Sequence, residues 1–156
     1  MPDTDSNGST VPDFHGHFLY GVDDSRRVMI PAKWRPKDSR VVFTAILWPI
    51  EIEECLLVLP PERWRILLET LKTKSLNDKR VATLERVIGA TSAPLLLDKV
   101  GRFCLPDHLS KPASIEKEAQ FVSRVQKFEI WSPARYQAAI SEDKSVAAAM
   151  AVEINI

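Results

Sequence analysis

The chain contains the same pattern twice, and this internal repeat limits its possible folds more than any other feature. The segment Tyr20–Pro31 aligns without a gap with Leu95–Pro106, so an aspartate, an arginine and a proline each recur 75 positions later. A second match, Leu56–Trp64 with Phe128–Tyr136, follows at a spacing of 72 positions. Two ordered matches indicate a duplicated unit. Each unit is too short to bury much apolar surface alone, so the two halves of this 156-residue chain are expected to pack into one body.

Each half is predicted to contain a hairpin, a short helical turn, two more strands and a helix, which makes the fold class α+β. Apolar runs on both sides of a small polar loop indicate the hairpin. Pro31 and Pro61 suit the first turn of a helix, and Ser132 is a typical helix cap. The predicted strands are 18–22, 28–30, 41–47, 55–59, 121–125 and 128–131.

The segment between the halves has the apolar spacing of a helix. Ser75 and Asp78 are its start signals and Gly89 its expected end, so it is predicted to be a connecting helix. The polar segment at the N-terminus is expected to be disordered, and the alanine-rich C-terminal tail fits either a frayed helix or disorder. The predicted boundaries are a tail at 1–13, repeats at 14–72 and 91–140, a connection at 73–90 and a tail at 141–156.

Composition narrows the class of protein. The 21 basic residues equal the 21 acidic ones, so the chain is not a uniformly basic coat for nucleic acid. Its apolar runs are shorter than the roughly 18 residues that span a bilayer, and its first residues do not form a secretion signal, so a soluble, cytoplasmic protein is expected. Cys55 and Cys104 lie far apart within apolar strings, and both are predicted to be buried and reduced.

The repeated loops are the strongest candidates for function. Each has the pattern Asp-x-x-x-Arg, from Asp23 to Arg27 and from Asp98 to Arg102. An aspartate at the start of a turn accepts backbone N–H groups, and Gly101 can adopt the positive φ that tight turns often need. An arginine held in this way can contact phosphate or form paired hydrogen bonds with guanine. The alternative is that the ion pair only braces the turn.

Local charge favours contact with a polyanion near the first loop. The stretch 20–40 carries six cations against three anions, whereas 95–115 carries three against two. Such a charge run indicates an electrostatic footprint, although a solvated face has the same appearance. Lys33 and Arg35 either flank the contact with DNA or are exposed helix charges.

Five motifs together resemble the MraZ family of bacterial transcriptional regulators, over about Phe14 to Ile140. They are Phe14-x-Gly16, Asp23-x-x-x-Arg27, Ile30-Pro-Ala-Lys-Trp-Arg35, Asp98-Lys-Val-Gly-Arg102 and Lys127-Phe-Glu-Ile-Trp131. The resemblance implies a doubled swapped-hairpin β-barrel fold of the AbrB type with pseudo-twofold symmetry. It also implies ring-shaped homo-oligomers on the nucleoid. These would bind double-stranded DNA at short tandem G-rich repeats, upstream of the division and cell-wall operon.

The resemblance places the DNA contacts in the two loops. The predicted contacts are Arg26, Arg27, Lys33, Arg35, Lys99 and Arg102, and the predicted positioning residues are Asp23, Asp98 and Gly101. The chain departs from the family pattern at Arg26, where the family has glycine. If the turn needs a positive φ there, either Arg26 carries about 1 kcal/mol of strain or the loop takes another shape. Arg26 is expected to keep phosphate affinity while changing base preference.

Two other classes of function compete with DNA binding. His15 and His17 share one face of a strand and could bind a metal with Asp13 or Glu53, but a full set of ligands is missing. No nucleophile or phosphate-loop motif occurs, so no enzyme activity, cofactor or metal is predicted. The stronger alternative is an oligomeric interaction protein that has lost specific DNA binding.

Overall fold

A computed structural model describes residues 13–156, apart from the side chain of Ser75. The tail predicted to be disordered therefore lies, except for Asp13, outside the described residues. The strands are β1 (His17–Gly21), β2 (Arg27–Met29), β3 (Val42–Trp48), β4 (Cys55–Leu59), β5 (Ala93–Leu96), β6 (Arg102–Cys104), β7 (Glu118–Ser123) and β8 (Phe128–Trp131). The helices are the 3-10 turn η1 (Ala32–Trp34), α1 (Pro61–Ser75), α2 (Lys79–Thr91), α3 (Asp107–Ser110) and α4 (Pro133–Glu153). The fold is α+β, as predicted, and the boundaries proposed for the two repeats stay a prediction.

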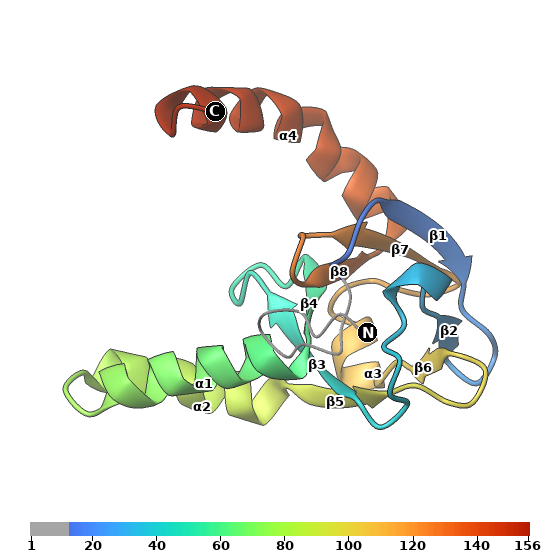
Figure 1. Ribbon diagram of the computed structural model, residues 1–156, viewed down its shortest axis with the longest axis horizontal. Helices are drawn as coiled ribbons and strands as arrows, with labels where there is room; N and C mark the ends of the chain where they lie inside the picture. The colour runs from blue at the N-terminus through green and yellow to red at the C-terminus, as the bar shows by residue number, and fades with distance from the viewer. Residues whose placement is uncertain (1–12) are drawn as a thin grey trace, which may run out of the picture.

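Both sheets contain strands from both halves of the chain. The six-stranded sheet has the order β1-β7-β8-β4-β3-β5, and β2 pairs with β6 in a separate two-stranded ribbon. All of these pairs are antiparallel. If each strand is replaced by its counterpart in the other half, the order of the large sheet is simply reversed. The strand order is thus symmetric under exchange of the two halves, which share one body (Figure 1).

The predicted hairpins are wrong beyond their turns. In the first half, β1 pairs with β7 instead of β2, and only the single bridge between Val22 and Val28 joins the two flanking segments. The ribbon partner of β2 is β6 of the second half. A strand pair formed across halves buries apolar side chains from both, which a two-stranded hairpin alone cannot do.

The core between the halves is rich in aromatic side chains. Phe14 packs edge-on against Trp34 and Phe128, with ring centroids 5.4 and 5.1 Å apart, and all three rings are almost fully buried. The indole N–H of Trp34 donates to the carbonyl oxygen of His15 at 3.1 Å, so burial leaves no unpaired donor on this ring. Since Trp34 belongs to η1 and Phe128 to β8, the core ties the helical turn after the first loop to the second half.

The helices project from this body in two directions. α1 and α2 pack together as a pair on one side, and α4 extends away on another (Figure 1). The predicted connecting helix exists, but the side chain of Asp78 caps it through Arg80 N, while Ser75 ends α1. Gly89 lies inside α2 and does not end it, because the helical hydrogen bonds continue to Ser92 N.

The helix α4 begins where Ser132 predicted a start, and its C-terminal part is helical instead of disordered. The hydroxyl of Ser132 accepts a hydrogen bond from Arg135 N at 3.2 Å, as expected of a cap. The alanine-rich tail is helical as far as Glu153. Alanine has the highest helix propensity of any residue, which agrees with this extension.

Candidate nucleic-acid interface

The first Asp-x-x-x-Arg loop is closed by the carboxylate of its aspartate. Asp23 Oδ1 accepts hydrogen bonds from the backbone N–H groups of Ser25 and Arg27 at 2.9 and 2.8 Å. Asp23 Oδ2 accepts from Arg27 Nε at 3.2 Å. One carboxylate therefore holds both the turn and the guanidinium that leaves it.

The second loop repeats this arrangement atom for atom. Asp98 Oδ1 accepts from the N–H groups of Val100 and Arg102, each at 3.0 Å, and Asp98 Oδ2 accepts from Arg102 Nε at 2.8 Å. The fourth residue of each loop has positive φ, which is 63° at Arg26 and 88° at Gly101. The sequence thus specifies the same turn twice, although only the second copy has the glycine that tolerates this φ.

Hydrogen bonding lowers the pKa of both loop aspartates below the usual 3.8. The main cause is the backbone N–H of Arg27 for Asp23 and that of Arg102 for Asp98. These donors stabilise the ionised form of each carboxylate. Both aspartates are accordingly charged at neutral pH and can hold their arginines there.

The β2–β6 ribbon presents both loop arginines on one surface. Arg27 lies opposite Cys104, and Arg102 lies opposite Met29, so the central pair Val28 and Phe103 points inward and is buried. Because side chains alternate along a strand, the flanking residues point outward. The side chains of Arg27 and Arg102 are 41% and 31% exposed. The loops are therefore neither opposed nor turned into the core.

The same alternation corrects the prediction for one cysteine. Cys55 is buried on β4, as expected, but Cys104 is exposed. Its neighbour Phe103 takes the inward position on β6, which leaves Cys104 on the outer face. Met29 and Cys104 thus accompany the arginines on this surface, and sequence analysis had missed both. The signal for them was the period-two alternation through the short run after each loop.

The two loops also contact each other across the ribbon. Arg102 Nη1 lies 3.8 Å from Asp23 Oδ2, so the carboxylate of the first loop lies between both guanidinium groups. The four charged side chains of Asp23, Arg27, Asp98 and Arg102 sum to zero. This surface offers oriented hydrogen-bond donors, and its attraction for a polyanion must come from cations around it.

Arg35 contacts the second loop, although it follows the first loop in the chain. Its Nε donates to the carbonyl oxygen of Ile30 at 3.3 Å, and its guanidinium lies across Gly101. A Cβ built on Gly101 would approach Arg35 Cζ within 2.6 Å. Glycine suits this position because of its positive φ, and any side chain here would have to displace the guanidinium of Arg35.

In the first loop the arginine lies within the loop, and a small residue takes the place that corresponds to Arg35. Arg26 stands where the second loop has Gly101, and Ser110 stands 75 positions after Arg35. The Arg26 guanidinium donates to the carbonyl oxygens of Ile115 and Glu116, both at 2.8 Å, and Ser110 lines the same hollow beside it. Each loop is thus in contact with the other half through an arginine. In the first loop this arginine is Arg26, which belongs to the loop, and in the second it is Arg35, which comes from the first half.

This geometry bears on the predicted role of Arg26. Its side chain already has two carbonyl partners and lies 3.9 Å from Asp107, so it does not extend from the tip of the loop. Phosphate contact by Arg26 stays a prediction. Of the two alternatives for Arg26, the structure has the positive φ, at 63°.

The other predicted contacts lie around the ribbon. Lys99 is exposed at the tip of the second loop, and Lys33 is exposed on η1. Both can supply the positive charge that the arginine–aspartate cluster lacks. Arg35 is half-buried against Gly101, so it reaches solvent less freely than either lysine.

Residues 13–156 contain no group of three histidine, cysteine, aspartate or glutamate side chains placed to hold a metal. His17 instead lies 3.5 Å from the side-chain amide of Gln120. Within the same range, no helix is both long and apolar enough to cross a membrane.

The arrangement is suited to recognising oxygen and nitrogen acceptors on a nucleic acid. Each loop arginine uses Nε to bind its own aspartate, and Arg102 Nη1 also lies near Asp23, so among the described residues the Nη groups of Arg27 and Nη2 of Arg102 are left for another partner. An arginine can pair in this way with a phosphate or with guanine O6 and N7. A two-stranded ribbon is also narrow enough to enter the major groove of DNA.

Comparisons with known proteins point to one family. The model of the MraZ protein family, described as antitoxin-like, matches residues 89–153. The chain is 33% identical over 130 residues to a transcriptional regulator MraZ of Pediococcus pentosaceus, covering 83% of this chain and 87% of that one. It is 31% identical over 124 residues to the protein of the same name from Clostridium tetani, covering 80% and 84%. A third relative of that name, from Histophilus somni strain 2336, is 29% identical over 136 residues, covering 86% and 90%.

Proposed function

The chain belongs to the MraZ family, and from that premise we propose that it is a DNA-binding transcriptional regulator. The β2–β6 ribbon with its two loops is the contact surface. Arg27 and Arg102 read or grip the duplex, while Asp23 and Asp98 hold them. The protein acts in the cytoplasm on the nucleoid and is not an enzyme.

One observation carries this proposal more than any other. Two loops 75 residues apart in sequence come together so that both arginines lie on one surface, each anchored through Nε. An arginine whose orientation is fixed before binding loses less side-chain entropy when it meets its target. A structural role alone would not need both guanidinium groups to face solvent at the same ribbon.

The finer proposal concerns the fold and the assembly. The pairing of strands across the two halves, β1 with β7, β3 with β5, β4 with β8 and β2 with β6, supports a doubled swapped-hairpin barrel of the AbrB type. One ribbon touches few phosphates, so a single subunit of zero net charge would bind weakly. A ring of copies on tandem G-rich repeats, upstream of the division and cell-wall operon, raises the effective concentration of each further contact.

The competing function is an oligomeric interaction protein that no longer binds a specific sequence. The observation in its favour is the zero charge of the four loop side chains together with the internal partners of Arg26. In that case the Asp-Arg pairs only brace the turns.

A gel-shift assay with the protein's own upstream region distinguishes the two functions. We expect binding that weakens steeply between low and physiological salt and that falls when the tandem repeats are reduced from three to one. Tight binding to one repeat would contradict the tandem mode. Equal affinity for the upstream region and for a scrambled duplex would support the interaction protein.

A further inference from the structure

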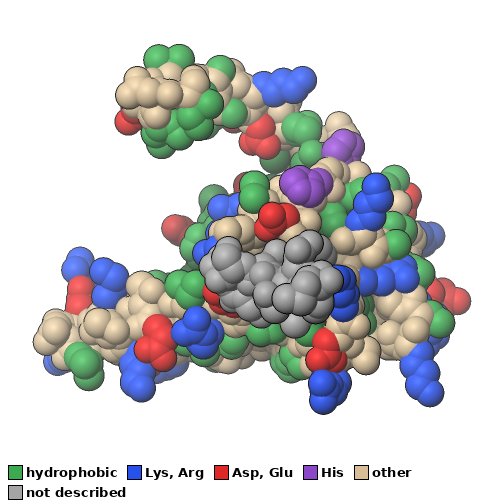
Figure 2. Space-filling view, viewed as in Figure 1, with side chains coloured by type: hydrophobic (Ala, Val, Ile, Leu, Met, Phe, Trp, Pro, Cys, Tyr) green, Lys and Arg blue, Asp and Glu red, His purple; other side chains and the backbone are tan. Residues whose placement is uncertain are grey.

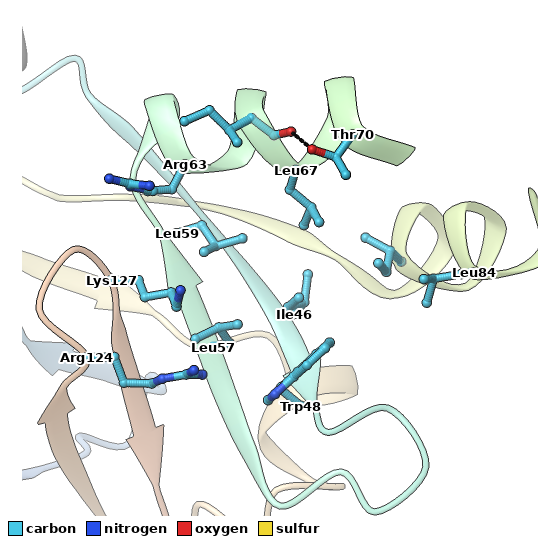
Figure 3. Close-up of a pocket in the computed structure, with 12 residues that line it drawn as sticks. Ile46, Trp48, Leu57, Leu59, Arg63, Leu67, Thr70, Leu84, Arg124 and Lys127 are labelled. Atoms are coloured by element: carbon cyan, nitrogen blue, oxygen red, sulfur yellow. Dashed lines mark hydrogen bonds between the residues drawn. The ribbon is translucent and has the colours of Figure 1, made fainter. Parts of the chain in front are cut away.

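A groove far from the loops combines an apolar floor with a basic rim. Its floor is formed by Ile46, Leu57 and Leu59 of β3 and β4, each buried. The helices α1 and α2 form one wall, and the volume is about 350 Å³ (Figure 3). The hollow has room for a few aliphatic side chains.

The rim of this groove carries more positive than negative charge. Arg63, Arg124 and Lys127 line it together, on the same side of the floor (Figure 3). These three cations are near one carboxylate, that of Glu129, whose Oε2 is 3.5 Å from Arg124 Nη1. Burial, and then the charges of Arg124 and Arg63, lower the pKa of Lys127, while Glu129 acts in the opposite direction. An anionic partner at the rim would relieve this repulsion.

The end of α4 has the complementary character. Glu142 and the adjacent Asp143 lie one helical turn before Val146, and Met150 lies one turn after it, so the four side chains share one face of the helix and line one hollow. We call these four residues the α4 stripe. All are exposed, and Figure 2 shows hydrophobic and acidic side chains on the projecting arm. The carboxylates precede the apolar pair, which is the order needed to meet a basic rim beside an apolar floor.

We propose that the α4 stripe of one subunit docks into this groove of a second copy of the chain. Glu142 and Asp143 meet Arg63 and Lys127, and Val146 and Met150 cover the apolar floor. The first turns of α4 are held by Tyr136, whose ring lies 6.0 Å from that of Trp131. The arm projects beyond the sheets (Figure 1), and its stripe lines an open hollow with Glu54 of the same chain, so the exposed stripe is accessible to a neighbour.

This contact joins two different surfaces, so it can be repeated from subunit to subunit until a ring closes. The inference therefore rests on the self-assembly part of the proposed function and names the surfaces that produce it. It is independent of DNA binding, because no residue of the loops takes part.

Charge exchange tests the pairing in the full-length protein. We expect Glu142→Lys with Asp143→Lys, and separately Arg63→Glu with Lys127→Glu, to weaken self-association about tenfold or more in sedimentation experiments. All four substitutions in one chain should restore most of the native association. The matched control is Lys144→Glu, which lies on α4 outside the stripe and should leave assembly unchanged.

A cross-link provides a second measurement with little change in charge. In a Cys104→Ser background, Leu84→Cys in the groove and Met150→Cys on α4 should form a disulfide between subunits, and neither cysteine alone should do so. Native assembly in both reversed pairs, or a fourfold variant no better than either pair, would overturn the proposal. A native chain that stays monomeric would overturn the ring as well, whereas unaffected assembly would refute only this interface.

Discussion

The two Asp-x-x-x-Arg loops have the same backbone and different means of support. In both, the aspartate accepts two backbone N–H groups and one arginine Nε. They differ at the residue with positive φ, which is Arg26 in one and Gly101 in the other. The first loop is braced by its own Arg26, and the second is covered by Arg35 from the other half. A duplicated turn can thus keep its shape while the source of its support changes.

The largest effect is expected from removing the loop arginines themselves. Arg27→Ala and Arg102→Ala should each weaken binding to the upstream DNA by about 1–3 kcal/mol, because each deletes a fixed pair of donors. Fluorescence anisotropy at constant salt measures the loss. Arg40→Ala is the matched control, since Arg40 pairs with Asp38 in a similar way but outside the ribbon. An equal loss in this control would show that only overall charge matters.

The next effect separates the two positive-φ positions. Gly101→Ala should lower the free energy of unfolding by about 2 kcal/mol, through backbone strain and contact with Arg35. Arg26→Ala should cost about 1 kcal/mol, because the strain is already present and only hydrogen bonds are lost. Urea unfolding at a fixed protein concentration gives both values.

Repeating both substitutions in an Arg35→Ala background tests whether contact with Arg35 is the reason that Gly101→Ala costs more than Arg26→Ala. There, Gly101→Ala should cost less, since the neighbour that it meets has gone, whereas the cost of Arg26→Ala should not change. The same cost for Gly101→Ala in both backgrounds would mean that Arg35 does not constrain the second loop.

A smaller effect is expected for the aspartates. Asp23 touches both loop arginines, Arg27 at 3.2 Å and Arg102 at 3.8 Å, whereas Asp98 is paired with Arg102. Asp23→Asn should therefore reduce DNA affinity by roughly tenfold, and Asp98→Asn by only a few-fold. Asp38→Asn serves as the control for loss of one exposed carboxylate. Equal effects of the first two variants would deny the contact across the ribbon.

The smallest effect concerns pH. The pKa of Asp23 and that of Asp98 are both lowered below 3.8 in the folded protein, mainly by backbone N–H groups. Their contribution to stability is therefore complete above that value and is lost as the pH falls through the lower folded pKa. The variant Asp23→Asn with Asp98→Asn should lose less stability than the native chain on acidification below about pH 4. The two single variants should behave alike, because the cause is the same in both loops.

Much of the local structure could be predicted because its causes lie within a few residues. The repeat located both loops, Pro31 and Pro61 marked the helical turns that follow strands, and Ser132 marked the start of α4. The positive φ at Arg26 could be suspected because Arg26 occupies the position of the repeat that Gly101 occupies in the second half. Where two signals competed, sequence reasoning chose wrongly, as for Ser75 and Asp78 at the start of α2.

The sequence predicted which residues form the candidate site, but not which of them contact one another. The loop arginines and aspartates were named from sequence, but the partners of Arg26 and Arg35 were not, because they lie in the opposite half. The outward position of Cys104 depends on which face of β6 meets the core. The basic groove beside α1 was not predicted either, because its lining comes from β3, β4, α1, α2 and the β7–β8 turn, which meet only in the folded chain.

The sequence by itself determined the duplication, the chemistry of each turn and the residue types that the turns carry. Only the tertiary structure decided that β1 pairs with β7, that β2 pairs with β6, and that Arg27 and Arg102 consequently share a surface. The physical reason is the distance along the chain over which each interaction acts. A turn is set by torsion angles and hydrogen bonds among about five consecutive residues, whereas strand partners are selected by which apolar faces the whole chain can bury together.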